Sequence, residues 1–149
     1  MPVLHGTLTA ADGALQAILI ELTRMDVARR RRTGSPVPLS VTVAALIDTG
    51  SEITCIDPSI VSQLGLIPKN LGPTNVPAAG GFQFNWLYDV NLTIPHPFAP
   101  AAQQLVIPVL EVAEVPLNAR GCDTLIGRDV LASCVLIYDG VGNSFTLTY

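Results

Sequence analysis

The chain has 149 residues, of which 49% are hydrophobic and 13% are charged, and its formal net charge is −4. This length suffices for a buried core, and we expect a single domain over residues 1–149. A mildly acidic chain gives no reason to expect a nucleic-acid partner. Twelve prolines and twelve glycines interrupt the apolar sequence, which favours short strands and turns over long helices and predicts an all-β fold.

The cysteines and histidines limit the chemistry open to the chain. Cys55, Cys122 and Cys134 are odd in number and lack metal-ligand spacing, so we expect reduced thiols in a cytoplasmic compartment. The two histidines, His5 and His96, are too few for a multi-histidine metal site and give poor support to Ser-His catalysis. No metal or other cofactor is expected. The sequence has no signal-peptide pattern and no apolar run of membrane-spanning length, so no membrane association is expected.

The first 23 residues predict a hairpin. Residues 3–9 and 15–22 are two apolar runs, and Asp12-Gly13 between them is a typical turn sequence. A helix over residues 14–30 is the competing interpretation, because Ala, Leu, Gln and Glu favour helices. The symmetric position of the turn favours the strands.

The next segment, residues 24–38, is strongly basic. It contains five of the chain's eight basic residues, Arg24 and the run Arg29 to Arg32, and then Thr-Gly-Ser-Pro. We expect a solvated loop between two strands. A contact for an acidic partner and a protease-sensitive segment are the two functional alternatives.

Residues 41–47 are almost entirely apolar and predict a buried strand, which delivers Asp48 to a turn made of Thr49, Gly50 and Ser51. This arrangement sets an ionisable group on a rigid support beside hydrogen-bond donors, as a catalytic acid requires. The alternative is an ordinary Asp-Gly type turn, which is common in proteins.

Several further elements follow the Asp48 turn. A short strand is expected over residues 53–56, and Asp57, Pro58 and Gly65 predict a helix over 58–64 with an N-cap, a first residue and a stop. Between two strand-like segments in residues 74–94, the run that ends in Ala79, Gly80 and Gly81 predicts a mobile hairpin tip.

The C-terminal third predicts strands and one short helix. Strands are expected over 105–110 and 125–127, a helix over 129–134, and a closing hairpin with strands over 135–138 and 144–149.

Two motifs in this chain together resemble those of the retropepsin-like aspartic proteases, a family that includes retroviral, cellular and bacterial members. The first motif is Leu46-Ile47-Asp48-Thr49-Gly50-Ser51 and the second is Leu125-Ile126-Gly127-Arg128. The resemblance covers residues 36–149, and it leaves residues 1–35 as an N-terminal hairpin and Arg-rich loop extension. It implies a retropepsin-like acid protease barrel with one or two short helices, which acts as a homodimeric aspartic endopeptidase on peptide or protein substrates.

The resemblance also implies roles for individual residues. Asp48 of each subunit would be catalytic, Thr49 would lock the two active-site loops together, Gly50 would contact substrate backbone, and Ser51 would hydrogen-bond the Asp48 carboxylate. The flap over the substrate would carry Ala79, Gly80 and Gly81 at its tip. The resemblance further implies a structural ion pair between Glu52 and Arg128 and a dimer interface strand over residues 145–149.

The chain departs from the family in two ways, and two other functions stay open. Asp48 and Gly127 are 79 residues apart, which exceeds the retroviral spacing, and residues 1–35 have no counterpart in the minimal enzyme. A dimeric binding or adaptor module with the same fold would hold peptides without cutting them. An independent small β-domain with a chance turn motif would be a monomer.

Overall fold

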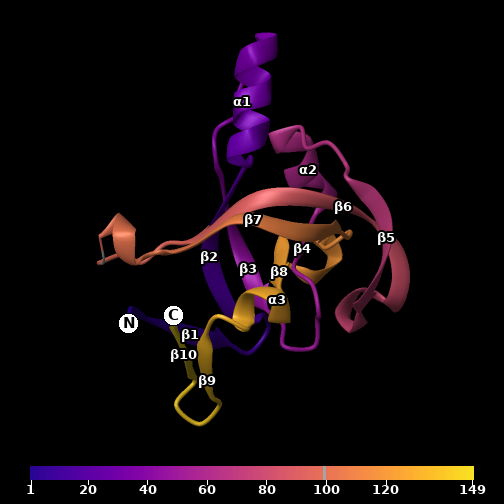
Figure 1. Ribbon diagram of the computed structural model, residues 1–149. Coiled ribbons are helices and arrows are strands. Elements are labelled where there is room, and N and C mark those ends of the chain that lie inside the picture. The colour runs from indigo at the N-terminus through magenta and orange to yellow at the C-terminus, as the bar shows by residue number, and fades with distance from the viewer. Residues whose placement is uncertain (99) are drawn as a thin grey trace.

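The computed structural model describes residues 1–98 and 100–149. The chain is mostly β-strand, in agreement with the all-β prediction (Figure 1). The strands in the described residues are β1 (Val3–Thr9), β2 (Gly13–Glu21), β3 (Val41–Ile47), β4 (Cys55–Ile56), β5 (Asn70–Val76), β6 (Gly81–Ile94), β7 (Leu105–Glu114), β8 (Thr124–Ile126), β9 (Val135–Asp139) and β10 (Ser144–Thr148). The helices are α1 (Arg24–Thr33), α2 (Pro58–Leu64) and α3 (Arg128–Leu131), with single 3-10 turns η1 (Pro77–Ala79), η2 (Ala101–Gln103) and η3 (Asn118–Arg120).

The strands form one sheet in the order β5-β6-β7-β4-β8-β3-β2-β1-β10-β9. An additional antiparallel pairing joins β2 to β6 through Leu19, Ile20 and Glu21. Strands β3 and β8 are parallel neighbours, with Ile47 opposite Ile126, although their sequences are far apart. The two motifs of the sequence therefore end side by side.

The main core lies between these strands and is closed on one side by α2. Apolar side chains of β2, β6 and β7, such as Ile18 and Leu92, are fully buried in it, and α2 contributes Ile60 and Leu64. The predicted helix over 58–64 is confirmed with its signals: Asp57 accepts a hydrogen bond from Ser59 N, and Gly65 has φ +56°.

The N-terminal hairpin is confirmed, since β1 and β2 pair across the Asp-Gly turn with Leu8 opposite Ala14. The competing helix over 14–30 is wrong in its first half. The loop predicted over residues 24–38 is also wrong, because α1 occupies most of it. Thr23 caps the start of α1, Gly34 ends it with φ +69°, and arginine is a good helix former.

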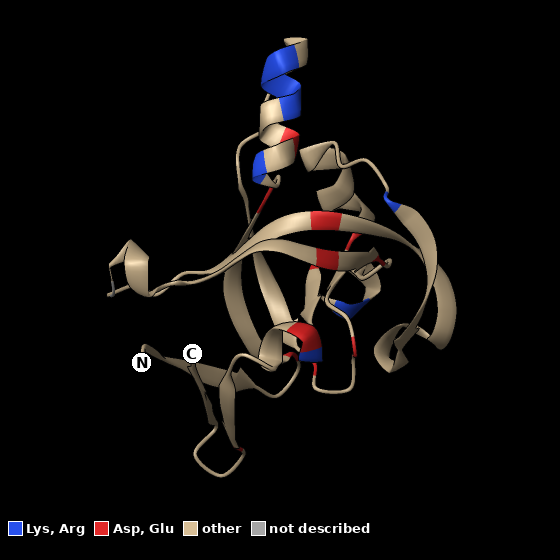
Figure 2. Ribbon diagram, in the orientation of Figure 1, with Lys and Arg blue, Asp and Glu red and all other residues tan. Residues whose placement is uncertain are grey.

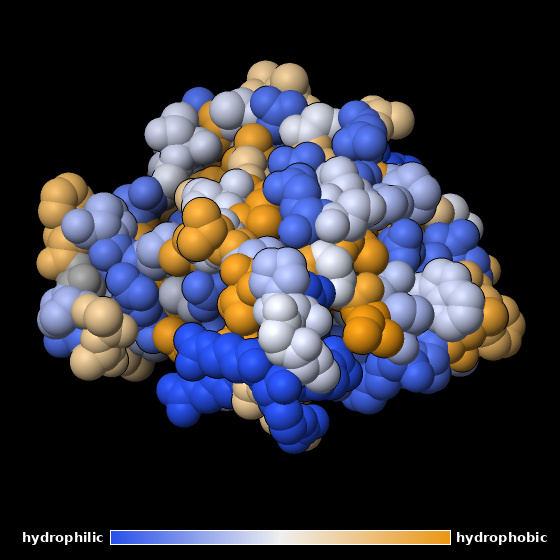
Figure 3. Space-filling view, turned by 90° about the horizontal axis from the view of Figure 1, so that it is seen from above, coloured by the Kyte–Doolittle hydropathy of each residue, from blue (hydrophilic) through white to orange (hydrophobic). Residues whose placement is uncertain are grey.

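Helix α1 projects from the sheet at the end of the molecule opposite the turn that follows β3 (Figure 1). Figure 2 shows that the basic residues concentrate on this helix, whereas acidic residues are spread over the rest of the chain. Figure 3 looks down on the α1 end and shows strongly hydrophilic side chains gathered beside apolar ones.

The closing hairpin is confirmed, but the predicted interface strand over residues 145–149 is not an edge. Strand β10 pairs on one side with β1 and on the other side with β9. The last strand of the sheet is β9 instead, because the N-terminal strand occupies the free side of β10. The side chains of Val135, Ile137 and Tyr138 on β9 are 54%, 58% and 62% exposed.

Candidate active site

Asp48 follows β3, which pairs in parallel with the fully buried strand β8. Strand β3 itself is buried on one side only, through Val43 and Ala45, so the prediction of a fully buried strand is wrong for its other side. The backbone N–H of Asp48 donates to the carbonyl of Ile126 at 3.0 Å, which continues the pairing of β3 with β8 by one residue. The apolar strands therefore fix the position of the backbone that carries the carboxylate. This is the rigid support that the sequence predicts.

The Asp48 carboxylate is bound on one oxygen only. Gly50 N–H donates to Oδ1 at 2.9 Å, and Ser51 N–H donates to the Asp48 carbonyl at 3.2 Å, so the residues form a tight turn. A Cβ on Gly50 would stand 3.1 Å from Oδ1, which is a close approach that glycine avoids. The other oxygen, Oδ2, is buried and has no hydrogen-bond partner within the described chain. A buried carboxylate oxygen without a partner is costly, so this atom calls for a donor from outside the chain.

Ser51 does not bind the Asp48 carboxylate, and that prediction is wrong. Its hydroxyl donates to the Ile53 carbonyl at 2.7 Å, and the side chain is fully buried. The turn directs the Ser51 hydroxyl into the interior, and the backbone N–H of Gly50 donates to the Asp48 carboxylate in its place. Thr49 and Gly50 are exposed, and a role for Thr49 in a dimer stays a prediction.

The second motif contacts the Asp48 loop through backbone. Gly127 N–H donates to Thr54 Oγ at 3.1 Å, and Arg128 N–H donates to the Ser51 carbonyl at 2.9 Å. A Cβ on Gly127 would stand 2.5 Å from the carbonyl carbon of Ile53, so only glycine fits where the two segments cross.

Thr54 and Asp129 complete this crossing, and the sequence reasoning did not find them as a pair. The Asp129 carboxylate accepts from Thr54 Oγ at 2.7 Å and from Thr54 N at 2.8 Å, across 75 residues of sequence. Asp129 also accepts from Val130 N at the start of α3. The only sequence signal is an acidic residue at a helix start next to Gly-Arg, which does not indicate a partner.

The predicted ion pair between Glu52 and Arg128 is not formed among the described residues. Glu52 accepts from the backbone N–H of Asn75 at 3.0 Å, whereas Arg128 donates to the Thr49 carbonyl at 3.2 Å. The two side chains leave the crossing in different directions: Glu52 binds the β5–β6 hairpin, and Arg128 binds the turn that holds Asp48.

The structure places the predicted tip residues Ala79, Gly80 and Gly81 at the end of the β5–β6 hairpin. Gly80 and Gly81 have φ of +107° and +87°, which favours glycine at both positions. Ala78 and Ala79 pack against a buried cluster that also contacts Leu46 and Ile53, which flank the Asp48 turn. Together with the contact between Asn75 and Glu52, this packing holds the hairpin over the Asp48 loop.

A shallow depression beside the loop is acidic. Its volume is about 410 Å³, and it is lined by Glu52, Ile53, Leu110, Glu111 and Asp129. Asp129 is already bound by Thr54, and Glu111 pairs with Lys69 at 3.0 Å. Glu52 therefore has the least satisfied carboxylate among these residues.

The cysteines and histidines form no second catalytic centre in the described residues. Burial raises the pKa of Cys55 to about 12, which keeps this thiol protonated and unreactive near neutral pH. His5 contacts Thr146, and His96 contacts the Val3 carbonyl, so the two rings serve separate local contacts. Within residues 1–98 and 100–149, no group of three or more His, Cys, Asp or Glu is arranged to hold a metal ion. The helices in those ranges are all too short or too polar to cross a membrane.

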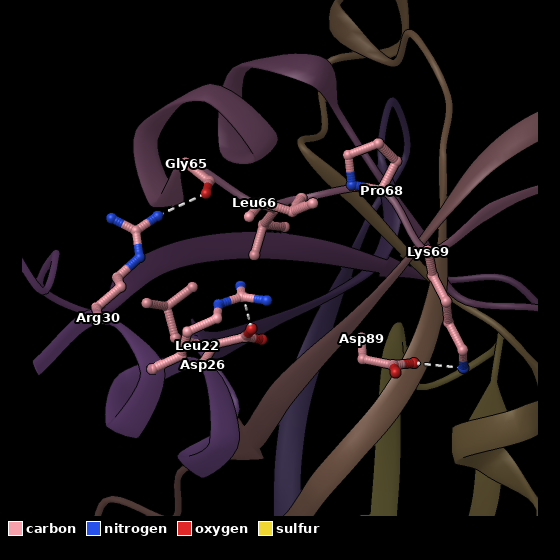
Figure 4. Close-up of a pocket in the computed structure, with 10 residues that line it drawn as sticks. Leu22, Asp26, Arg30, Gly65, Leu66, Pro68, Lys69 and Asp89 are labelled. Carbon is pink, nitrogen blue, oxygen red and sulfur yellow. Dashed lines mark hydrogen bonds and ion pairs between the residues drawn. The ribbon is translucent and has the colours of Figure 1, made fainter. Parts of the chain in front are cut away.

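A separate cavity of about 200 Å³ lies between α1, the segment after α2, and β6 (Figure 4). Its ionic groups bind one another: Arg29 pairs with Asp26 at 2.6 Å, and Lys69 pairs with Asp89 at 3.0 Å. Arg30, which also lines the cavity, donates to main-chain carbonyls, so each ionic side chain of the lining already has a partner within the protein.

Comparison with known protein families gives no match to this chain, and neither does comparison with curated protein sequences.

Proposed function

We propose that this protein is a retropepsin-like aspartic endopeptidase whose active site forms from two copies of the chain. The observation that carries the proposal is the Asp48 carboxylate at the end of β3 beside the buried parallel strand β8, with Oδ1 fixed by Gly50 and Oδ2 buried without a partner in the described chain. The pairing of β2 with β6 supports the barrel that such a fold requires, because it joins strands from distant parts of the sheet order.

The second carboxylate comes from a second copy of the chain. The sequence contains one Asp-Thr-Gly turn. The neighbouring carboxylates already have structural partners, since Asp57 caps α2 and Asp129 binds Thr54. Two Asp48 side chains that meet on a two-fold axis and share a proton would satisfy the partnerless oxygen of each.

The exposed edge strand β9 is the surface that we assign to this dimer. Its apolar side chains and unpaired backbone groups favour association with another strand. The β9–β10 hairpin lies at the same end of the molecule as the turn that carries Asp48 (Figure 1). The two are also connected through packing, because Ile47 and Leu136 contact the same buried cluster around Phe145.

The proposed reaction uses the two carboxyl groups as a base and an acid. The ionised Asp48 takes a proton from water, and the water oxygen attacks the carbonyl carbon of the peptide bond. The protonated Asp48 gives its proton to the carbonyl oxygen. When the tetrahedral intermediate collapses, the C–N bond breaks, the leaving nitrogen receives a proton from the first carboxyl group, and the second, now ionised, carboxylate takes the proton of one hydroxyl group as the product carbonyl forms. The β5–β6 hairpin covers the peptide and limits access of further water.

The test is cleavage of an unbiased peptide library from acidic to neutral pH by the wild type and by Asp48→Asn at the same dimer concentration. We expect the Asn variant to lose at least about a hundredfold in rate, because an amide cannot exchange the proton. The matched control is Asp123→Asn, the same change at the other Asp-Thr pair, which we expect to cleave as the wild type does.

Two outcomes would overturn the proposal. If neither wild type nor Asp48→Asn cleaves any peptide while the protein is dimeric, the non-proteolytic binding module becomes the better explanation. If Asp48→Asn cleaves at the wild-type rate, Asp48 does not serve as the catalytic acid.

A further inference from the structure

Helix α1 is capped at both ends but contributes no buried residue to the core. Thr23 Oγ accepts from Asp26 N at 3.2 Å, and Gly34 N–H donates to the last carbonyls of the helix. Caps at both ends stabilise a short helix that would be marginal in isolation. Only Val27 of α1 packs, partly buried, against the main core, so most of the helix presents exposed side chains, and these call for a function.

Two of its five arginines have internal partners. Arg30 donates to the carbonyls of Pro36 at 2.9 Å, Leu64 at 3.2 Å and Gly65 at 2.6 Å, which fastens α1 to the end of α2 (Figure 4). Arg29 pairs with Asp26 on the exposed side of the helix. Among the described residues, Arg24, Arg31 and Arg32 have no hydrogen-bond or ion-pair partner.

Arg24 and Arg31 line one groove. They are seven residues apart, so they lie on the same face of α1 with a rise of about 10 Å between them. The groove has a volume of about 410 Å³ and runs between α1 and the extended segment that leads to β3. Its floor is apolar and includes Leu22, Val27 and Val37.

The groove also contains a buried acceptor that is not satisfied. Asn91 Nδ2 donates to Glu21 at 3.3 Å, while Asn91 Oδ1 is buried and has no partner in the described chain. Both residues line the groove. A backbone N–H from a bound extended chain would satisfy Oδ1, and Glu21 would disfavour a second carboxylate at that wall.

We propose that the groove between α1 and residues 35–40 binds an extended, acidic segment of a partner protein. In an extended chain, side chains four positions apart share a face and are about 13 Å apart. Arg24 and Arg31 are separated by a rise of about 10 Å along α1, and their long, flexible side chains can span the difference. A segment of the form Glu-x-Leu-x-Glu would place its carboxylates on Arg24 and Arg31 and its leucine on the apolar floor.

The chemistry of the groove favours such a segment over a polyanion. Among the described residues, no aromatic side chain lines the groove for base stacking. Helix α1, which forms one wall of the groove, and the turn after β3 lie at opposite ends of the molecule (Figure 1), so the proposal does not depend on the proposed protease activity.

The test measures binding of the labelled peptide Ser-Glu-Ser-Leu-Ser-Glu-Ser by fluorescence anisotropy at low and physiological salt. A matched peptide with Gln in place of both Glu residues reports the need for carboxylates. The groove variant is Arg24→Gln/Arg31→Gln, and the outer-face variant is Arg29→Gln/Arg32→Gln, two arginines of the same helix that do not line the groove. The two variants change the net charge equally, and circular dichroism checks that each is folded. The Asp48→Asn protein, with all its arginines intact, provides a form that should not cut the probe.

We expect the groove variant to weaken binding of the Glu peptide by about tenfold or more, and the outer-face variant to weaken it by less than about threefold. The Gln peptide should bind as weakly to wild type as the Glu peptide binds to the groove variant. Equal losses in both variants would overturn the proposal in favour of a non-specific basic surface. If a twenty-nucleotide oligothymidylate or anionic vesicles bind more tightly than the Glu peptide, the proposal is overturned in favour of those partners. If the Glu peptide does not bind at low salt, the proposal is also overturned.

Discussion

Asp57 shows how one buried carboxylate organises several backbone groups. The side chain is 1% exposed, and its two oxygens accept from Ser59 N at 2.9 Å and from Leu117 N at 2.8 Å. Burial by itself would raise the pKa of Asp57, but the backbone N–H groups of Leu117 and Ser59 favour the charged form and leave the pKa below its ordinary value. The residue therefore joins α2 to the segment before η3 as well as capping the helix.

Replacing Asp57 should destabilise the protein in a pH-dependent way. We expect Asp57→Ala to lower the free energy of unfolding by about 2–3 kcal/mol at pH 7, because a helix cap and a buried N–H both lose their acceptor. Because the folded state lowers this pKa, the stabilisation from ionised Asp57 is complete above about pH 4 and is lost as the pH falls through the folded-state value.

Urea unfolding from pH 7 down to pH 3 measures this effect. The difference between wild type and Asp57→Ala should shrink on the acidic side, whereas the control Asp123→Ala should stay within about 0.5 kcal/mol of wild type. A difference that is the same at every pH would contradict the role of the ionised carboxylate.

At the scale of elements, Thr54 makes the buried hydrogen bonds at the crossing of the Asp48 loop with the start of α3. Thr54 is fully buried, accepts from Gly127 N–H, and donates to Asp129. Since Gly127 leaves no space for a Cβ at this crossing, neither segment can move without the other. The crossing thus connects the second motif to the turn that orients Asp48.

Thr54→Val keeps the shape of the side chain and removes its hydroxyl. We expect a loss of about 2 kcal/mol in stability, because the buried Gly127 N–H loses its acceptor and the partly buried Asp129 carboxylate loses a donor. If the protein is a protease, its activity should also fall at pH values where the variant remains folded. Chemical denaturation measures the first effect and peptide cleavage measures the second. The control is Thr42→Val, on the exposed side of β3, which should change neither the stability nor the cleavage rate by much. A Thr54→Val protein as stable as wild type would show that the crossing does not depend on the hydroxyl.

At the scale of the whole molecule, strand β9 at one end of the sheet is the surface to which we assign the proposed dimer. The edge strand β9 carries exposed Val135, Ile137 and Tyr138, and its inner neighbour β10 is paired on both sides. The strand has five residues, of which the first four are apolar or aromatic and the last is Asp139, and an exposed apolar edge of this kind favours association with another strand.

Placing a charge on this edge should separate the proposed dimer. We expect Ile137→Lys to be a folded monomer by analytical ultracentrifugation, with no peptide cleavage, because two lysines would be desolvated beside each other across the two-fold axis. Val141→Lys, in the fully exposed turn of the same hairpin, should remain dimeric and active. A dimer that survives Ile137→Lys would place the interface elsewhere.

Local sequence signals were sufficient wherever neighbouring residues determine the structure. Helix α2 has its cap at Asp57 and its stop at Gly65, and the first hairpin has its Asp-Gly turn, as predicted. For α1 the same type of signal was present in Thr23, Asp26 and Gly34, but the run of arginines suggested a solvated loop instead. Charge indicates exposure, and an exposed segment with good caps can still be helical.

The sequence by itself determined the mostly β fold, the strand that delivers Asp48 to its turn, and the hairpin that ends in Gly80 and Gly81. Only the tertiary structure decided the partners of these elements: Gly50 rather than Ser51 on the Asp48 carboxylate, Thr54 on Asp129, and β1 on the free side of β10. Strand and turn propensities act over a few neighbouring residues, whereas each of these contacts depends on where packing of the core directs a side chain or brings together segments that are distant in sequence.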